Sequence, residues 1–267
     1  MTGGRLDAAL VARGLARSRA RAGELIRAGV VVVDGTVVAK PSHQVSTSTE
    51  IVLTRDAERW VSRAAHKLLR ALVLWPIEVD GRRCLDVGAS TGGFTQVLLE
   101  HGAEHVTALD VGHGQLVATL AADPRVLDLP GTNVRDVEPA ALGEPFDLVV
   151  CDVSFISLTV VLPAMRRLVS DAGNLVVLVK PQFEVGRERL ARTGVVTSRA
   201  EHRRVLRTVH EAAAAVGLDV RGAARSPIRG GEGNVEFLLW LAPRRPGAGA
   251  LGVDDMLESI DAQEEEP

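Results

Sequence analysis

Two lysines and two carboxylates in this sequence stand where they could act together on one bound substrate. Asp152 and Lys180 each come directly after an apolar run typical of a buried strand, and Glu236 opens a later run of the same kind. Lys67 lies on a helical pattern over 64–72. Because the ends of neighbouring strands meet at one edge of an open α/β sheet, we expect these four side chains to face one pocket. A solvated or structural charge is the alternative for each of them, and for Lys67 above all.

The choice of basic residue adds to this expectation. Of the 31 basic residues only Lys40, Lys67 and Lys180 are lysine, and the rest are arginine. A lysine retained in such a chain indicates a site that a planar, permanently charged guanidinium would not serve. A lysine accepts a proton only when neutral, and lowering its pKa from about 10.4 to about 7 costs roughly 4 to 5 kcal/mol. Lys180 as a general base and Lys180 as a charged donor therefore both stay open.

A turn of small residues follows the strand-like run 84–87 and opens a helix. Its members are Gly88, Ala89, Ser90, Thr91, Gly92, Gly93 and Phe94. Such residues let the backbone approach a ligand at the carboxyl edge of a sheet. Asp110 ends the next strand-like run, where a carboxylate can accept hydrogen bonds from both hydroxyls of a ribose. The turn lacks the G-x-G-x-x-G spacing of dinucleotide sites, which favours S-adenosylmethionine over NAD. Asn133 is a candidate adenine contact, and we expect no metal.

The elements that must position these residues follow from the hydrophobic pattern. From residue 82 onward, apolar strand-like runs alternate with amphipathic helical patterns, which predicts a parallel sheet covered on both faces. The last two runs, 218–224 and 236–241, are separated only by a Gly-rich turn. A hairpin there makes the final strand antiparallel. This α/β layout resembles the Rossmann-like, seven-stranded sheet of methyltransferases.

The amino-terminal part is different in pattern and in charge. Two short helical patterns precede strand-like runs around the turn Asp34-Gly35, which predicts a small α+β module. Residues 1–70 carry 12 basic and 6 acidic side chains, whereas the remainder carries 19 and 28. A basic head on an acidic body indicates a polyanionic partner for the head, although a solvated charged face is the alternative.

Here the sequence resembles the S4 RNA-binding domain. The resemblance is carried by Arg5-Leu6-Asp7, Arg13-Gly14-Leu15, Ser18-Arg19, Leu25-Ile26, Gly29 to Val32, Asp34-Gly35 and Lys40-Pro41-Ser42. It implies that Arg5, Arg17, Arg19 and Lys40 contact RNA. The chain has no tyrosine and 3% aromatic residues, so we expect recognition through phosphate and RNA shape rather than through base stacking on a sheet.

The set Lys67, Asp152, Lys180 and Glu236 resembles the Lys-Asp-Lys-Glu tetrad of FtsJ-related ribose 2′-O-methyltransferases. Together with the S4-like head, the chain resembles the TlyA family of ribosomal RNA 2′-O-methyltransferases, historically described as haemolysins. The resemblance implies that the four residues are catalytic and that S-adenosylmethionine is the cofactor. It also implies that the product is a 2′-O-methylated cytidine in 16S or 23S ribosomal RNA, or in both. Phe155 is a candidate wall for a target nucleotide turned out of the RNA.

The change of sequence pattern along the chain and the two resemblances set the domain boundaries. We expect an S4 domain over 1–58, a linker over 59–63, a methyltransferase domain over 64–243, and a tail over 244–267 that forms a short helix and ends in disorder. The sequence does not indicate an oligomeric state.

Other classes of protein are weighed against this assignment. The sequence holds no run of about 18 uncharged apolar residues and no signal-like start, and its two cysteines lie in apolar runs, so we expect a cytoplasmic protein. A membrane-active protein would need an apolar span or a basic amphipathic helix. A pseudouridine synthase with an S4 head would need no cofactor turn. A non-catalytic RNA-binding ribosome assembly factor would not depend on Lys180 or Asp152.

Overall fold

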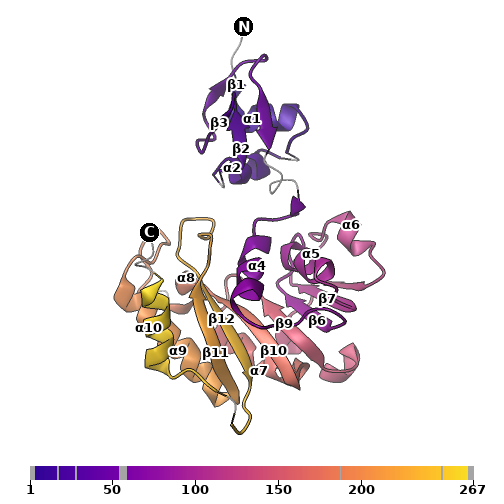
Figure 1. The fold of residues 1–267 in the computed structure, drawn as a ribbon, viewed down its shortest axis with the longest axis vertical. Coiled ribbons are helices and arrows are strands. Elements are labelled where there is room, and N and C mark those ends of the chain that lie inside the picture. The colour runs from indigo at the N-terminus through magenta and orange to yellow at the C-terminus, as the bar shows by residue number, and fades with distance from the viewer. Residues whose placement is uncertain are drawn as a thin grey trace. The chain divides into compact units, whose positions relative to one another are not determined.

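The computed structural model describes residues 4–16, 18–27, 29–53, 59–186, 188–247 and 249–263. The chain divides into two compact units, residues 1–63 and 64–267 (Figure 1). Each unit has its own core, so each is described by itself. The candidate RNA contacts lie in the first unit and the candidate catalytic residues in the second.

The amino-terminal unit packs two helices against short strands. Its described elements are β1 (Gly4–Arg5), α1 (Leu6–Ala12), α2 (Arg19–Arg27), β2 (Val31–Val33), β3 (Thr36–Val37), β4 (Gln44–Val45) and β5 (Ile51–Leu53). Strands β3, β2 and β5 form an antiparallel sheet, and β1 pairs with β4. Leu6, Leu10, Ile26 and Val31 are fully buried between the helices and the strands. The β1–β4 pair is too short to leave a pattern in the sequence, and we did not expect it.

The second unit is built on a seven-stranded sheet in the order β11-β12-β10-β9-β6-β7-β8. Its strands are β6 (Arg83–Val87), β7 (His105–Asp110), β8 (Val126–Pro130), β9 (Phe146–Cys151), β10 (Val169–Val179), β11 (Leu218–Arg225) and β12 (Phe237–Pro243). Strands β6 to β10 pair in parallel, and β12 lies antiparallel between β10 and β11. The predicted Rossmann-like sheet with an antiparallel last strand is confirmed.

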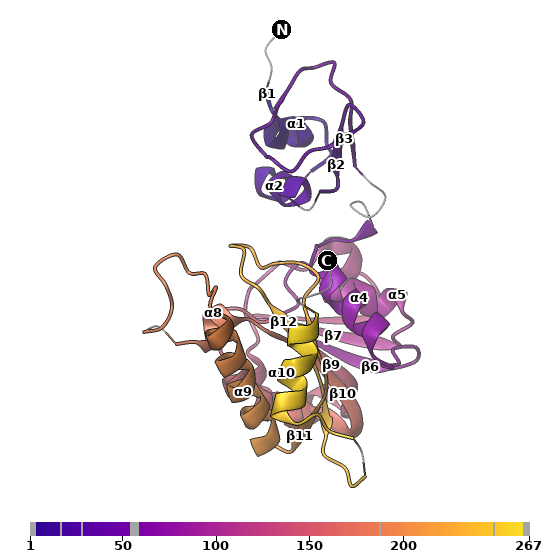
Figure 2. The ribbon, with the colours of Figure 1, turned by 60° about the vertical axis from the view of Figure 1, so that its left-hand side comes forward.

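Helices cover both faces of this sheet, as continuous apolar strands require. They are α4 (Ala65–Leu74), α5 (Gly93–Glu100), α6 (Ala118–Ala121), α7 (Leu158–Leu168), α8 (Pro181–Glu184), α9 (Arg199–Ala215) and α10 (Val253–Ala262), with the 3₁₀ turns η1 (Val134–Asp136) and η2 (Pro139–Leu142). Figure 2 shows α9 and α10 on one side of the sheet and α4 and α5 on the other. Met256, Leu257 and Ile260 bury the apolar side of α10 in the main core.

Two elements differ in length from the pattern. The helical pattern of the sequence over 116–122 predicts a helix there, but α6 spans only Ala118–Ala121, and Leu116 lies outside it, near Gly92. Strand β10 begins at Val169, directly after α7, and a register shift between Val169 and Asn174 interrupts its pairing with β9. The polar residues at this shift conceal the start of the strand in the sequence. The disorder predicted for the end of the tail falls on residues 264–267, outside the described residues.

Candidate active site

Three strands bring the candidate residues to one edge of the sheet. Asp152 follows the last residue of β9, and Lys180 follows the last residue of the neighbouring strand β10. Glu236 precedes β12, whose first residue, Phe237, pairs with Val179 at the end of β10. Because β12 runs antiparallel, its start lies beside the ends of its parallel neighbours.

Lys67 completes the group from helix α4. Its Nζ lies 3.1 Å from Asp152 Oδ2 and 2.7 Å from Glu236 Oε2. Lys180 Nζ lies 2.7 Å from Asp152 Oδ1. Lys67, Lys180 and Glu236 are buried, and the Asp152 side chain is 12% exposed. The structure therefore brings all four residues into one network of ion pairs, with Asp152 shared between the two lysines.

Burial and charge oppose each other in this network. Burial by itself would lower the pKa of Lys67, but the carboxylates of Asp152 and Glu236 outweigh it and raise that pKa above its ordinary value. Burial would likewise raise the pKa of Asp152, but Lys67 and Lys180 hold it below its usual range. Lys67 and Asp152 therefore stay ionised at neutral pH.

The loop after β9 adds a further contact to Lys180 and carries an exposed aromatic ring. Lys180 Nζ donates a hydrogen bond of 2.8 Å to Ser154 Oγ, so this nitrogen lies between the Ser154 hydroxyl and the carboxylate of Asp152 with which it is paired. The next residue, Phe155, is 91% exposed with a φ of 65°, a region that non-glycine residues rarely adopt. Its ring centroid lies 5.0 Å from that of Phe183, which follows Lys180 on α8. An exposed ring, Phe155, and a partly buried one, Phe183, thus stand beside the buried lysine, whose Nζ lies 6.0 Å from the centroid of the Phe183 ring.

The glycine turn lies against the same network. Gly88 follows β6 with a φ of 84°, and a Cβ atom placed there would come within 2.9 Å of the Asp152 carbonyl oxygen. Gly92, with a φ of 97°, precedes α5, and a Cβ there would meet Leu120 and Leu116. Both positions therefore require glycine, for backbone conformation and for space. The chain thus makes a compact turn from β6 into α5, next to Asp152, formed by Gly88, Ala89, Ser90, Thr91, Gly92, Gly93 and Phe94.

Asp110 ends β7 at the rim of this turn. Its Oδ2 accepts a hydrogen bond from the Ser90 backbone N–H, at 2.8 Å, and its Oδ1 accepts one from that of Gly112, at 2.7 Å. These bonds fix the carboxylate and leave lone pairs for the hydroxyls of a ribose. Asn133 caps η1, and its Oδ1 accepts a hydrogen bond from the Arg135 backbone N–H.

The buried Asp86 links β6 to α5, the two elements that the turn joins. It is fully buried on β6, and its Oδ2 accepts a hydrogen bond of 2.7 Å from Thr95 Oγ1 on α5. Burial raises the pKa of Asp86 to about 7, although Thr95 opposes the rise. The turn, the fixed carboxylate of Asp110 and the close approach at Gly88 fit an adenosine-bearing cofactor at this edge.

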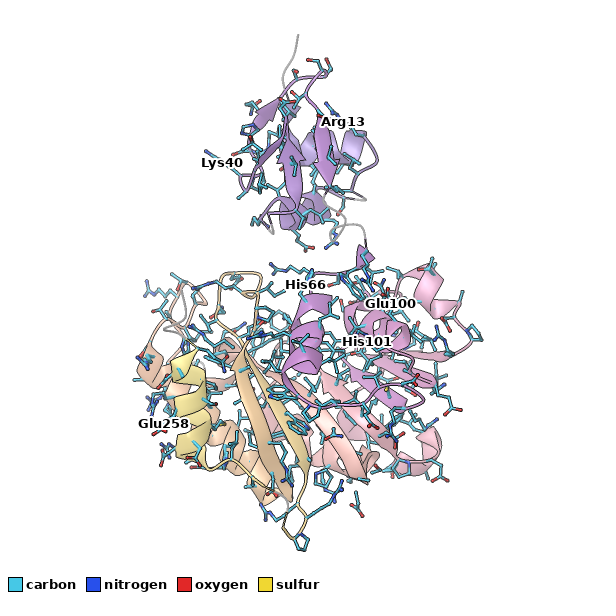
Figure 3. All side chains as sticks on the ribbon, viewed as in Figure 1. Arg13, Lys40, His66, Glu100, His101 and Glu258 are labelled. Carbon is cyan, nitrogen blue, oxygen red and sulfur yellow. The ribbon has the colours of Figure 1, made fainter. Side chains whose placement is uncertain are left out.

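The candidate RNA contacts lie in the amino-terminal unit. Arg5 and Arg19 both pair with Asp7, at 2.9 Å and 3.0 Å, and keep 46% and 61% of their side chains exposed. Figure 3 shows Lys40 projecting outward from this unit, where it is exposed. Arg17 lies outside the described residues.

Sequence reasoning missed three residues that hold the site residues in place. Ser154 accepts a hydrogen bond from Lys180, and Asp7 joins Arg5 to Arg19. Glu184 on α8 accepts hydrogen bonds from the Ser157 hydroxyl and from the Leu158 backbone N–H at the start of α7, which ties the loop after β9 to the one after β10. Glu184 and Ser154 stand in the segments that follow two predicted strands, and that position was the available signal.

The other predicted classes of site can be examined in the described residues. Among them no group of three or more His, Cys, Asp or Glu side chains is arranged to hold a metal ion. No helix within the described ranges has the length and apolar character to cross a membrane. Cys84 and Cys151 are both free and buried, and burial raises the pKa of each thiol to about 12.

Comparisons with known proteins agree with this geometry. The family model of FtsJ-like methyltransferases matches residues 60–242, and the S4 domain model matches residues 4–51. The chain is 51% identical over 253 residues to the 16S/23S rRNA (cytidine-2′-O)-methyltransferase TlyA of Mycobacterium tuberculosis, covering 94% of each chain. It is 37% identical to Hemolysin A of Brachyspira hyodysenteriae, over 88% of this chain and 98% of that one. A solved structure named as a hemolysin from Streptococcus thermophilus superposes with a TM-score of 0.73 at 38% identity, covering both chains in full.

Proposed function

The chain belongs to the FtsJ-like methyltransferases and, among them, to the TlyA family, and from this premise we propose how its residues methylate RNA. The reaction is the S-adenosylmethionine-dependent methylation of a ribose 2′-hydroxyl in ribosomal RNA. By its likeness to the mycobacterial enzyme, the target is a cytidine of the 16S or 23S RNA, or of both. The observation that carries the proposal is the buried network of Lys67, Asp152, Lys180 and Glu236 beside the glycine turn.

The glycine turn and Asp110 are the proposed cofactor site. In this assignment the backbone from Gly88 to Phe94 cradles the cofactor, Asp110 accepts the ribose hydroxyls, and Asn133 lies at the adenine. S-adenosylmethionine, when bound, supplies an electrophilic methyl group on its sulfonium. The position of Gly88 against the Asp152 carbonyl supports this arrangement, because it places the turn next to the catalytic network.

Lys180 is the proposed residue at the reacting oxygen. A ribose hydroxyl is a weak acid that must lose its proton as its oxygen attacks. Asp152 and Ser154 hold Lys180 Nζ from two sides, and an amine with three possible hydrogen bonds can also contact the 2′-oxygen. As a charged donor Lys180 orients the oxygen and lowers the cost of its developing negative charge, and the hydroxyl proton passes to solvent as the new bond forms; as a neutral amine it accepts that proton itself. Lys67 and Glu236 hold Asp152, and therefore Lys180, in place.

The exposed ring of Phe155, with the partly buried ring of Phe183 against it, is the proposed wall for the target nucleotide. A base inside a folded RNA must leave its stack before its ribose can reach a buried lysine. An aromatic ring that is 91% exposed offers a surface for the displaced base, and Phe155 lies within the loop that carries Ser154. Arg5, Arg17, Arg19 and Lys40 of the S4 domain are the proposed contacts to the RNA backbone.

Exchange of the central lysine tests the proposal. Lys180→Ala and Lys180→Arg are each expected to lower methyl transfer by at least about 100-fold, because neither restores a compact ammonium at that point. Cofactor binding, measured by calorimetry, is expected to persist in both. Mass spectrometry of ribosomal RNA nucleosides measures the product. The control is Arg245→Lys, which replaces an arginine by a lysine far from the site, near the start of β10 and the end of β12. There Arg245 Nε donates a hydrogen bond to the Asp171 carbonyl oxygen. Methylation at the native rate in Lys180→Arg would refute the assigned role.

A further inference from the structure

A buried acid, Asp7, lies between two basic side chains of the amino-terminal unit. Asp7 is 6% exposed, and both oxygens of its carboxylate accept hydrogen bonds from basic side chains or from the backbone. Oδ1 accepts hydrogen bonds from Arg5 Nε at 3.0 Å and from the Ala8 backbone N–H at 2.8 Å. Oδ2 accepts from Arg5 Nη2 at 2.9 Å and from Arg19 Nη2 at 3.0 Å. One carboxylate therefore holds two guanidinium groups side by side.

The two arginines reach Asp7 from elements that are themselves fixed. Arg5 lies on β1, which pairs with β4, and Arg19 begins α2. The Asp7 backbone N–H donates to the Pro41 carbonyl, which anchors α1 near the strands. Both arginine side chains remain about half exposed, and each has donors that Asp7 does not engage and that can reach a ligand.

The cluster of Arg5, Asp7 and Arg19 carries a net positive charge. Two arginines against one carboxylate give a net charge of +1, and the guanidinium groups of Arg5 and Arg19 hold the pKa of Asp7 well below its usual range. Arg5 commits two of its five donors to Asp7 and Arg19 commits one. The remaining donors can form the forked, charge-assisted hydrogen bonds that suit phosphate oxygens.

We propose that Asp7 is a positioning residue that aligns Arg5 and Arg19 into one preformed site for RNA backbone phosphate. The inference rests on the proposed function, since it assumes that the S4 domain binds RNA. Fixing a long side chain before binding removes an ordering cost equivalent to about 2- to 10-fold in affinity for each chain. Loss of Asp7 should therefore weaken RNA binding, although it makes the domain more basic.

Asp7→Asn in the full chain tests this inference against simple electrostatics. We expect a 30-nucleotide RNA hairpin, measured by fluorescence anisotropy, to bind about 5- to 100-fold more weakly. Glu24→Gln removes the same charge from the same domain, where Glu24 pairs with Arg21 at 3.2 Å, and is expected to leave affinity unchanged or slightly higher. Equal weakening in the two variants, or tighter binding by Asp7→Asn, would overturn the inference.

A background that lacks both arginines separates positioning from a structural role. In the variant Arg5→Ala/Arg19→Ala, adding Asp7→Asn is expected to cause no further loss, because nothing remains to be aligned. A further loss would show that Asp7 acts through the fold instead. If the Arg5→Ala/Arg19→Ala variant itself binds RNA normally, the RNA contacts assigned to this domain fail together with the inference. If it binds weakly while Asp7→Asn binds normally, only the inference fails.

Circular dichroism and thermal melting accompany each binding measurement. Should Asp7→Asn unfold the amino-terminal unit, Asp7→Glu replaces it, because this variant keeps the carboxylate but moves it by one methylene. The net charge is then unchanged, and weaker RNA binding in the folded variant supports the alignment of the arginines. Native affinity of Asp7→Glu, with its side chain too long for the same contacts, would contradict it.

Discussion

Replacement of Lys67 by methionine probes the energetics of the candidate active site. The lysine and methionine side chains are similar in length, so the substitution removes one buried charge with little change of volume. At an effective dielectric constant of about 20, the pairs at 3.1 Å and 2.7 Å correspond to roughly 5 and 6 kcal/mol of attraction, which offset the cost of burying the ions. Removing one partner of such a buried network costs about 3 to 5 kcal/mol, because the carboxylates remain buried.

The expected result is a large loss of stability that depends on pH. At pH 7.5 we expect Lys67→Met to unfold about 6 to 20 °C below the parent chain, using about 2 to 4 °C per kcal/mol for a unit of this size. In the parent chain the lowered pKa of Asp152 contributes stability that is present above about pH 4 and is lost as the pH falls. The variant lacks much of this contribution, so its deficit should be largest near neutral pH and shrink toward pH 4.

Urea titrations at several pH values, with thermal scans, measure both effects. Lys40→Met makes the same substitution at an exposed position of the amino-terminal unit and should change the unfolding free energy by no more than about 0.5 kcal/mol. A deficit for Lys67→Met below about 1 kcal/mol at pH 7.5 would refute the interpretation of this lysine as a buried, doubly paired charge. A deficit that grows toward pH 4 would refute its electrostatic origin.

Two further predictions concern the cofactor turn. Gly88→Ala should reduce S-adenosylmethionine affinity at least about tenfold in calorimetry, because its Cβ would meet the Asp152 carbonyl at 2.9 Å, whereas Gly81→Ala, with a φ of 66° and open space around it, should retain affinity. Asp86→Asn should remove a pH dependence: with a pKa of about 7 when folded and about 4 when unfolded, Asp86 keeps a proton in the folded chain that the unfolded chain loses, so the stability of the parent chain falls by on the order of 2 kcal/mol between pH 5.5 and 8. Urea titrations at pH 5.5 and 8 measure this difference, and identical pH dependence in both chains would show that Asp86 does not titrate in this range.

The sheet was predictable because its strands are buried on both faces. Continuous apolar runs such as Leu148–Cys151 mark such strands directly, and ionisable residues just beyond them mark the edge where ligands bind. The segment between β11 and β12 is rich in glycine and shows no helical pattern, which indicated the antiparallel direction of β12. Short or interrupted elements left no such pattern: β1 has two residues, and polar residues interrupt the start of β10.

The candidate site was predictable as a set of residues but not as a set of contacts. Strand order places Asp152, Lys180 and Glu236 at one edge, yet nothing in the sequence states that Asp152 bridges both lysines. Lys67 reaches the network from a helix 85 residues before Asp152, a separation that no local pattern encodes. Ser154 and Asp7 act by orienting a neighbour in space, so their contributions depend on tertiary contacts that the sequence leaves open.

The scarcity of lysine acquires a physical reason in this geometry. Lys67 places one ammonium nitrogen between carboxylates that come from two different strands, at 3.1 Å and 2.7 Å, in a space almost closed to solvent. A guanidinium carries its donors on a wider planar fork, which pairs well with one carboxylate along an edge but cannot converge on two from a single atom. Lys180 faces a similar demand between Asp152 Oδ1 and Ser154 Oγ. In a chain that otherwise uses arginine at nearly every basic position, these two sites require a compact group whose single nitrogen can lie between two oxygens from different segments.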